Sequence, residues 1–205
     1  MAAGRRGSVL HTLALRANKC DEQSAFAAAK MLRTNNTLKS LEMSLSPLAS
    51  KGVTSIAEAL KSNRTLNHLD LRNTDCGNEG AAALADMLRS NETLTELFIS
   101  NVVRHYTCVY EATHNKFGKD GAVALADALR VNNSLKELHL CNNDITDEGL
   151  RCFAEALVEN KALKWLCTNY RDDEFMERLD QDKRQRIIQR LRINCFCEED
   201  CSDLD

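Results

Sequence analysis

The fold is decided by the stretch between residues 66 and 93, which reads LNHLDLRNTDCGNEGAAALADMLRSNET. In its first part Leu66, Leu69 and Leu71 follow the pattern L-x-x-L-x-L. In its second part Leu84 and Leu88 are four residues apart, the spacing of one face of a helix. Because the hydrophobic period changes from two residues to about 3.6, the stretch predicts a short strand followed by a helix.

The same pattern returns in phase along the chain. Six segments open with a leucine, at successive spacings of 28, 28, 28, 41 and 28 residues. One such unit cannot bury its own apolar face, so the repetition predicts that the units stack into a solenoid. The opening leucines are Leu10, Leu38, Leu66, Leu94, Leu135 and Leu163. A glycine recurs at Gly52, Gly80, Gly121 and Gly149, with Ser24 in the first unit, and an asparagine recurs at Asn35, Asn63, Asn91, Asn132 and Asn160.

This pattern resembles the leucine-rich repeat of the ribonuclease-inhibitor type, which is found in ribonuclease inhibitor, in the Ran GTPase-activating protein and in the repeat regions of NOD-like receptors. The resemblance covers roughly residues 9–170. It implies an α/β solenoid of horseshoe shape, with parallel strands on the concave face and helices on the convex face. These families use one solenoid for different purposes, so the resemblance defines a fold and not a function.

Two sets of asparagines have expected structural roles. Asn35, Asn63, Asn91 and Asn132 stand in N-x-S/T triplets, the acceptor pattern for glycosylation. Their spacing is that of the repeat, so we interpret them as helix-end residues instead. The family resemblance implies a second set of buried amides in the turns after the strands. It falls on Asn18, Asn115 and Asn143, with Ser46 and Thr74 replacing the amide in two units.

We divide the chain into three parts. Residues 1–8 are an N-terminal extension, residues 9–170 hold about six repeats of 28 residues, and residues 171–205 are a C-terminal capping helix and an acidic tail. The apolar residues of segment 174–192 fall on roughly one helical face, which predicts that this helix seals the last repeat.

The fourth unit carries an insertion at 102–114, whose removal restores the regular repeat. The insertion enters at the turn between strand and helix, where repeat proteins often carry binding loops. It contains no Gly or Pro and is apolar for an exposed loop, so a gene-model or splice-derived segment is the alternative interpretation.

Composition excludes several functional classes. The chain has 205 residues and a formal net charge of -3, so it lacks the excess of Lys and Arg on which nonspecific nucleic-acid binding depends. It has no apolar run near the roughly 20 residues that a membrane-spanning helix needs, and no secretory signal. We therefore expect a cytoplasmic protein with no nucleic-acid or membrane partner, with reduced cysteines, and with no cofactor or metal.

Alternation along the strands places their variable residues on the concave face. Phe98 and Trp165 are candidate aromatic anchors there, and an acidic track predicts a partner with a basic patch. His68 and Asp70 are neighbours on one strand, but no nucleophile is placed beside them, so no catalytic residue is predicted. The predicted protein-binding residues are Glu42, His68, Asp70, Arg72, Glu96, Phe98, Glu137, His139 and Trp165, and the acidic track is Glu42, Asp70, Glu96 and Glu137.

The sequence thus predicts a protein-binding scaffold or recognition module, similar to the repeat region of a NOD-like receptor, and not an enzyme. The phosphate-binding pattern G-x-x-x-x-G-K-[ST] is absent, so nucleotide-driven switching is not expected. The alternative is a GTPase-activating protein for a Ran-like small GTPase, since that family uses the same repeat; a structural spacer with ordinary solvated strands is a further interpretation. The first repeat has no cap over its N-terminal edge, so we also expect self-association there, unless a partner or further repeats cover it.

Overall fold

The computed structural model describes residues 9–101, 114–168, 181 and 192–194. Short strands and helices alternate along these residues. The elements are β1 (Thr12–Ala14), α1 (Glu22–Leu32), β2 (Ser40–Glu42), α2 (Ala49–Leu60), β3 (His68–Asp70), α3 (Gly77–Leu88), β4 (Glu96–Phe98), α4 (Lys119–Val131), β5 (Glu137–His139), α5 (Asp147–Glu159), β6 (Trp165–Cys167) and β7 (Arg192–Asn194).

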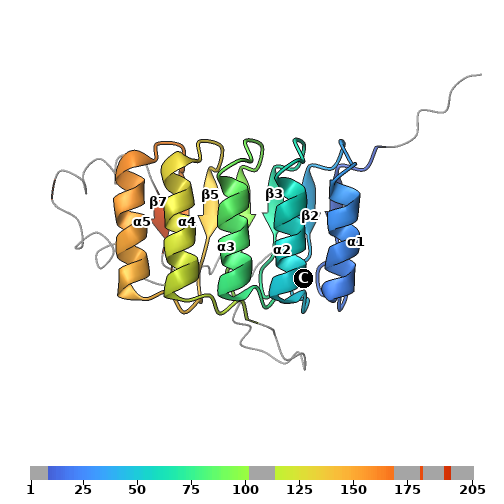
Figure 1. Cartoon of the computed structure of the whole chain (residues 1–205), viewed down its shortest axis with the longest axis horizontal. Helices are drawn as coiled ribbons and strands as arrows, with labels where there is room; N and C mark the ends of the chain where they lie inside the picture. Colours follow the sequence, from blue (N-terminus) through green and yellow to red (C-terminus); the bar gives the residue numbers. More distant parts are fainter. Residues whose placement is uncertain (1–8, 102–113, 169–180, 182–191, 195–205) are drawn as a thin grey trace, which may run out of the picture.

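The strands form one parallel sheet in sequence order, from β1 to β7. Helices α1 to α5 lie side by side in a single layer over one face of this sheet (Figure 1). Each helix is the crossover connection that a pair of parallel strands needs. The arrangement confirms the predicted α/β solenoid of strand–helix units.

The core lies between the sheet and the helix layer. Leu66, Leu69 and Leu71 enter it from the strand side, and Leu84 and Leu88 enter it from the helix, all without exposed surface. Burial of one leucine side chain contributes about 1.5–3 kcal/mol relative to leaving it in water. Every added repeat therefore extends one continuous core.

The repeated glycine lies where neighbouring helices touch. A Cβ atom at Gly52 would lie 2.8 Å from the Cβ of Ala25, and one at Gly149 would lie 2.8 Å from the Cβ of Ala122. Real Cβ atoms are essentially never this close, so only glycine permits the observed helix spacing. The first unit has Ser24 at this position, and no described helix precedes α1.

The asparagine at the end of each helix from α2 to α5 links its repeat to the preceding one. Asn91 Nδ2 donates to the carbonyl oxygens of Leu60 (2.7 Å) and Asn63 (3.2 Å) in the preceding unit. Its Oδ1 accepts from the N–H groups of Thr93 (2.9 Å) and Leu94 (2.8 Å). The same bonds recur at Asn63, Asn132 and Asn160. The buried amides confirm the predicted structural role.

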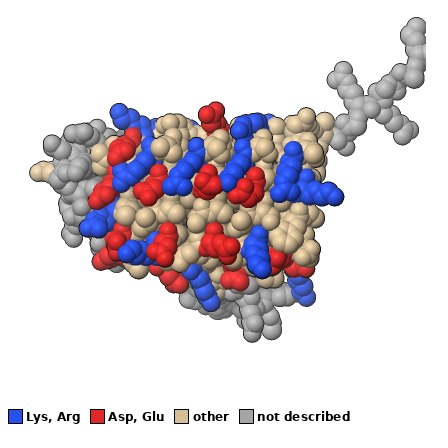
Figure 2. All heavy atoms as spheres, in the orientation of Figure 1, with Lys and Arg blue, Asp and Glu red and all other residues tan. Residues whose placement is uncertain are grey.

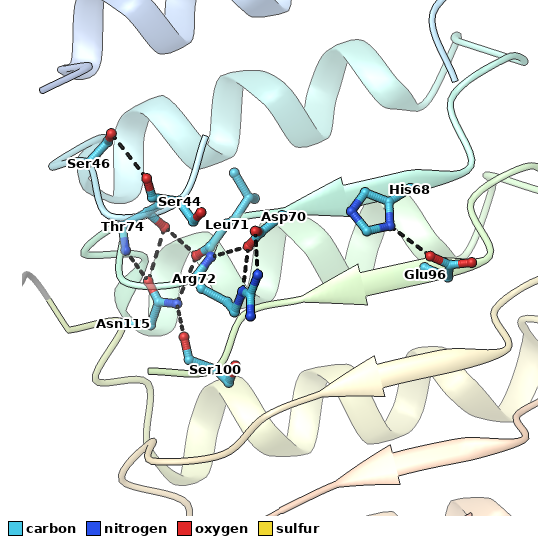
Figure 3. A network of polar contacts seen from close by, with 10 residues as sticks. All are labelled: Ser44, Ser46, His68, Asp70, Leu71, Arg72, Thr74, Glu96, Ser100 and Asn115. Carbon is cyan, nitrogen blue, oxygen red and sulfur yellow. Dashed lines mark hydrogen bonds and ion pairs between the residues drawn. The ribbon is translucent and has the colours of Figure 1, made fainter. Parts of the chain in front are cut away.

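The second set of amides is centred on Asn115 (Figure 3). Its Nδ2 donates to the carbonyl oxygens of Leu71 (3.0 Å) and Ile99 (2.9 Å), and its Oδ1 accepts from the N–H of Thr74 (2.9 Å). Asn143 makes similar bonds in the next unit. This network holds the turns after three consecutive strands in one arrangement.

The first two units depart from this scheme. The hydroxyl of Ser46 is buried, and its one described hydrogen bond, of 3.4 Å, goes to the carbonyl oxygen of Ser44. Asn18, predicted to be a buried amide, is exposed and bonds only to the carbonyl oxygen of Arg16 (3.1 Å) among the described contacts. Its prediction was wrong because no turn of a preceding unit lies beside the first repeat in the described chain.

The two ends of the insertion lie close together, although segment 102–113 itself is outside the described residues. The N–H of Asn115 donates to Oδ1 of Asn101 over 2.7 Å. Strands β4 and β5 on either side keep the pairing of the other strands, with Leu97 opposite Leu138. The chain therefore leaves the repeat and re-enters it at nearly the same point.

Strand β7 was not predicted. It pairs in parallel with β6, with Ile193 opposite Leu166. Arg190 stands in the sequence where the repeat has its opening leucine, so a search for leucines misses this strand. Arg192 starts β7 and so does not belong to the predicted capping helix 174–192. The rest of that helix, apart from the helical Gln181, and the acidic tail lie outside the described residues.

Deletion of residues 102–114 is expected to keep or raise the melting temperature. The deletion shortens a connection between Asn101 and Asn115, which already lie at hydrogen-bonding distance, so it lowers the entropy of the unfolded chain without removing a repeat. Thermal unfolding followed by circular dichroism measures the effect. A cooperative loss of folding would contradict the assignment of these residues to a loop.

Replacement of Asn91 by alanine is expected to lower the free energy of unfolding by roughly 2–4 kcal/mol, because several buried backbone groups lose their partner together. Urea denaturation measures this loss. The matched control is Asn133→Ala, because the side chain of Asn133 is exposed; this change should stay within about 0.5 kcal/mol of the wild type. Equal losses in both variants would refute the structural role of the Asn91 amide.

Candidate functional site

The sheet arranges its outward-facing residues in columns that run across the strands. The strand register confirms the predicted alignment, since residues one repeat apart are direct partners in neighbouring strands. We call the face formed by these columns the concave surface. Its first column is Thr12, Ser40, His68, Glu96, Glu137 and Trp165, and its second column is Ala14, Glu42, Asp70, Phe98, His139 and Cys167.

Four ring side chains form a continuous row across the concave surface. The ring of Phe98 lies 4.1 Å from that of His139, in a stacked arrangement, and 5.1 Å from the tilted ring of His68. Trp165 continues the row beyond His139, with a centroid distance of 6.3 Å. All four residues were predicted from the sequence to lie on the concave surface. Their contact was not predicted, because the row passes from the first column to the second and back. Phe98 and Trp165 are partly exposed, so the row offers ring surface to a ligand.

Asp70 and Arg72 bind each other (Figure 3). Arg72 donates from Nε to Oδ1 (3.0 Å) and from its Nη2 to Oδ2 (2.9 Å) of Asp70, a fork-like pair. Asp70 is 1% exposed. The expectation that Asp70 belongs to an exposed acidic track is therefore wrong, because its carboxylate is buried and neutralised by Arg72. The guanidinium of Arg72 also lies 5.4 Å from the centre of the Phe98 ring, close enough for a cation–π contact.

Glu96 and Glu137 are neighbours in the first column and keep much of their side chains exposed, 40% and 42%. Oε2 of Glu96 lies 2.7 Å from Nδ1 of His68, and Oε2 of Glu137 lies 3.7 Å from Nε2 of His139. Two carboxylates on adjacent strands give this part of the concave surface a negative potential beside the ring row. Glu42 is partly exposed in the second column, two strands away.

The His68–Asp70 neighbourhood on β3 does not form a dyad. His68 contacts Glu96, and Asp70 contacts Arg72. Within the described ranges no group of three or more His, Cys, Asp or Glu residues could hold a metal ion. The arrangement offers ring surface and charge to a ligand, which suits recognition.

A disulfide joins Cys141 and Cys167 on the concave surface. Cys167 ends β6 and Cys141 lies two residues beyond the end of β5; their Cα atoms are 5.9 Å apart, within the usual range for such a bond. The expectation that all cysteines are reduced is wrong at this pair. That expectation rested on the absence of a secretory signal, and it did not consider a bond between residues of adjacent repeats. Cys20, Cys76 and Cys152 are free thiols in the described chain.

The convex face pairs its charges between neighbouring helices, and Figure 2 shows positive and negative side chains interleaved on it. Lys61, directly after α2, lies 2.5 Å from Asp86 of α3, and Lys119 of α4 lies 2.7 Å from Glu148 of α5. The hydrogen bond that Lys61 donates to Asp86 raises the pKa of Lys61. No helix among the described residues has both the length and the apolar character to cross a bilayer.

Comparison with known proteins agrees with this architecture. The family model described as Leucine Rich repeat matches residues 34–57, 62–85 and 131–154. The chain therefore carries leucine-rich repeats. No curated protein sequence matches it significantly.

Two solved structures share the fold over most of the chain. A leiomodin-1 structure, described as Actin-Binding Site 2, is 21% identical and covers 80% of this chain and 94% of its own, with a TM-score of 0.62. The tropomodulin C-terminal domain of Caenorhabditis elegans is 16% identical and covers 80% of this chain and 95% of its own, with a TM-score of 0.61. At these identities the likeness concerns the fold. The chain has the fold of a leucine-rich-repeat solenoid, and stacked repeats of this kind form an extended concave surface.

The free and bonded cysteines should differ in reactivity. Burial raises the pKa of the Cys76 thiol well above its ordinary value, so in the folded chain Cys76 should resist iodoacetamide while the more accessible Cys152 reacts. Peptide mapping without reductant should recover the link between Cys141 and Cys167. Rapid labelling of Cys76 before unfolding, or two unlinked peptides, would contradict these assignments.

Proposed function

We propose that this chain is a protein-binding module whose concave surface recognises a partner with a basic patch. The observation that carries the proposal is the row of rings from His68 to Trp165, flanked by the exposed carboxylates of Glu96 and Glu137.

The ring row has the properties of a binding centre. Aromatic side chains dominate the energetics of protein interfaces because they bury a large area at a small cost in conformational entropy. Phe98 is held between His68, His139 and the guanidinium of Arg72, so its orientation is fixed before a partner arrives. A preorganised anchor loses less entropy on binding.

Charge selects the partner. With Asp70 neutralised by Arg72, the acidic part of the predicted track reduces to Glu42, Glu96 and Glu137. Glu96 and Glu137 lie directly beside the ring row, and their side chains are 40% and 42% exposed. Lysine or arginine side chains of a partner would neutralise them, and this attraction would raise the association rate.

The finer predictions stay predictions. The comparisons support leucine-rich repeats in general and favour neither the repeats of NOD-like receptors nor a GTPase-activating protein for a Ran-like GTPase. Actin is one defined protein to test, because the similar leiomodin-1 structure is described as an actin-binding site.

Charge reversal at Glu96 should weaken capture of the partner. The immobilised chain is exposed to a cell extract, retained proteins are identified by mass spectrometry, and the dissociation constant is then measured directly. We expect Glu96→Lys and Phe98→Ala each to raise this constant about tenfold or more. Filamentous actin in a co-sedimentation assay gives a parallel arm with a purified protein.

The matched control is Glu92→Lys, which makes the same charge change at an exposed turn residue at the end of the preceding repeat. It should bind like the wild type, and circular dichroism should show all variants folded. Equal binding by Glu96→Lys, Phe98→Ala and the control would refute the concave surface as the binding site.

A further inference from the structure

The first repeat exposes apolar side chains that later repeats bury. Leu10 is 58% exposed, whereas Leu38, its equivalent in the second repeat, is 1% exposed. Val9 beside it is 56% exposed, and Met31 is only partly buried although its equivalents in α2 to α5 are fully buried. We call this side of the first repeat, which faces away from the second, the first-repeat edge.

The first-repeat edge does not fit another helix stacked in the manner of α1 on α2. That packing requires glycine at the start of the second helix, since a Cβ at Gly52 would come within 2.8 Å of Ala25. The edge has Ser24 at this position. Its Oγ and N–H instead bond to Asp21, so that the two residues cap α1 from within.

The charges on α1 also disfavour a preceding repeat of the same kind. In the stack, a basic residue at the C-terminal end of one helix binds an acidic residue of the next, as Lys61 binds Asp86 over 2.5 Å and Arg130 binds Glu155 over 3.5 Å. The position of these two acids is occupied in α1 by Lys30, which is exposed. A preceding repeat of the same kind would place its basic residue next to Lys30, and the two like charges would repel each other. A surface with an acidic residue opposite Lys30 fits this edge better.

Strand β1 is the edge of the sheet, with no strand beyond it among the described residues. In the interior strands the N–H of the first residue bonds to the preceding strand, as Ser40 bonds to the carbonyl oxygen of His11 over 3.0 Å. The equivalent N–H group in β1 is that of Thr12, which points away from β2 by the same register. An edge strand of this kind can pair with another strand.

We propose that the first-repeat edge binds the same edge of a second copy, about a two-fold axis normal to the sheet. Such an axis makes β1 antiparallel to its copy, extends the sheet across the pair, and keeps both helix layers on one face. It also runs α1 antiparallel to its copy, so that Lys30 of one chain approaches the acidic start of α1, Asp21, in the other. Leu10 of each chain, exposed in the single chain, becomes buried against the first-repeat edge of the other.

Sedimentation equilibrium on the full chain, from about 1 to 200 µM, tests this proposal. We expect the mass to rise to twice the 23.0 kDa of one chain. Leu10→Glu should hold the mass at that of one chain, because Leu10 is exposed in the single chain and a carboxylate there would be buried between copies. Lys30→Glu should also weaken the pair, by facing Asp21 of the second copy with a like charge.

The control for charge reversal is Lys164→Glu, at an exposed lysine in the sixth repeat, which should leave association unchanged. The geometry is tested by Ala27→Cys, since Ala27 is exposed at the middle of α1 and so lies next to the axis. Mild oxidation should link the substituted positions of two copies. A single-chain mass at every concentration would overturn the proposal, as would a pair that survives Leu10→Glu and Lys30→Glu without this link. These outcomes are independent of partner binding, because none of the variants lies on the concave surface.

Discussion

The carboxamide of the asparagine at each helix end is the contact on which the rest of this solenoid depends. A helix leaves its last carbonyl groups without partners, and the turn that follows leaves N–H groups in the same state. One asparagine satisfies both sets, and it does so across the boundary between two repeats, as Asn91 does between the second and third. Each repeat is thereby placed at a fixed distance and register from the one before it.

The concave surface follows from that register. Equivalent residues of successive repeats are direct neighbours on adjacent strands. A substitution in one repeat therefore changes the side chain that the equivalent residues of both adjacent repeats contact. Asp70 and Arg72 show this near the centre of the sheet, where they form an ion pair with each other. The guanidinium of Arg72 also lies over the ring of Phe98. The surface therefore has polar residues that hold the rings in place, and it also has carboxylates with much exposed surface, such as that of Glu96.

Most of the fold was predictable from sequence because the strands, helices and repeats each have a characteristic spacing of apolar residues. The change from a two-residue to a helical period locates the strands and helices, and the spacing of the leucines aligns the columns. Contacts between side chains of adjacent repeats were not predictable in this way, since they depend on which rotamer each residue adopts. For this reason the ring row, the burial of Asp70 and the bond between Cys141 and Cys167 were found only in the structure. Strand β7 was missed because Arg190 interrupts the leucine pattern.

The closed ends of the insertion have a consequence for how this chain can vary. Because Asn101 and Asn115 are joined by a hydrogen bond, the placement of the repeats on either side does not depend on the length of the segment between these two residues. Mutation can lengthen, shorten or replace that segment in the course of evolution without moving any strand. The same place is suited to laboratory use, where a short epitope or a fluorescent label can be carried by the protein without touching its sheet.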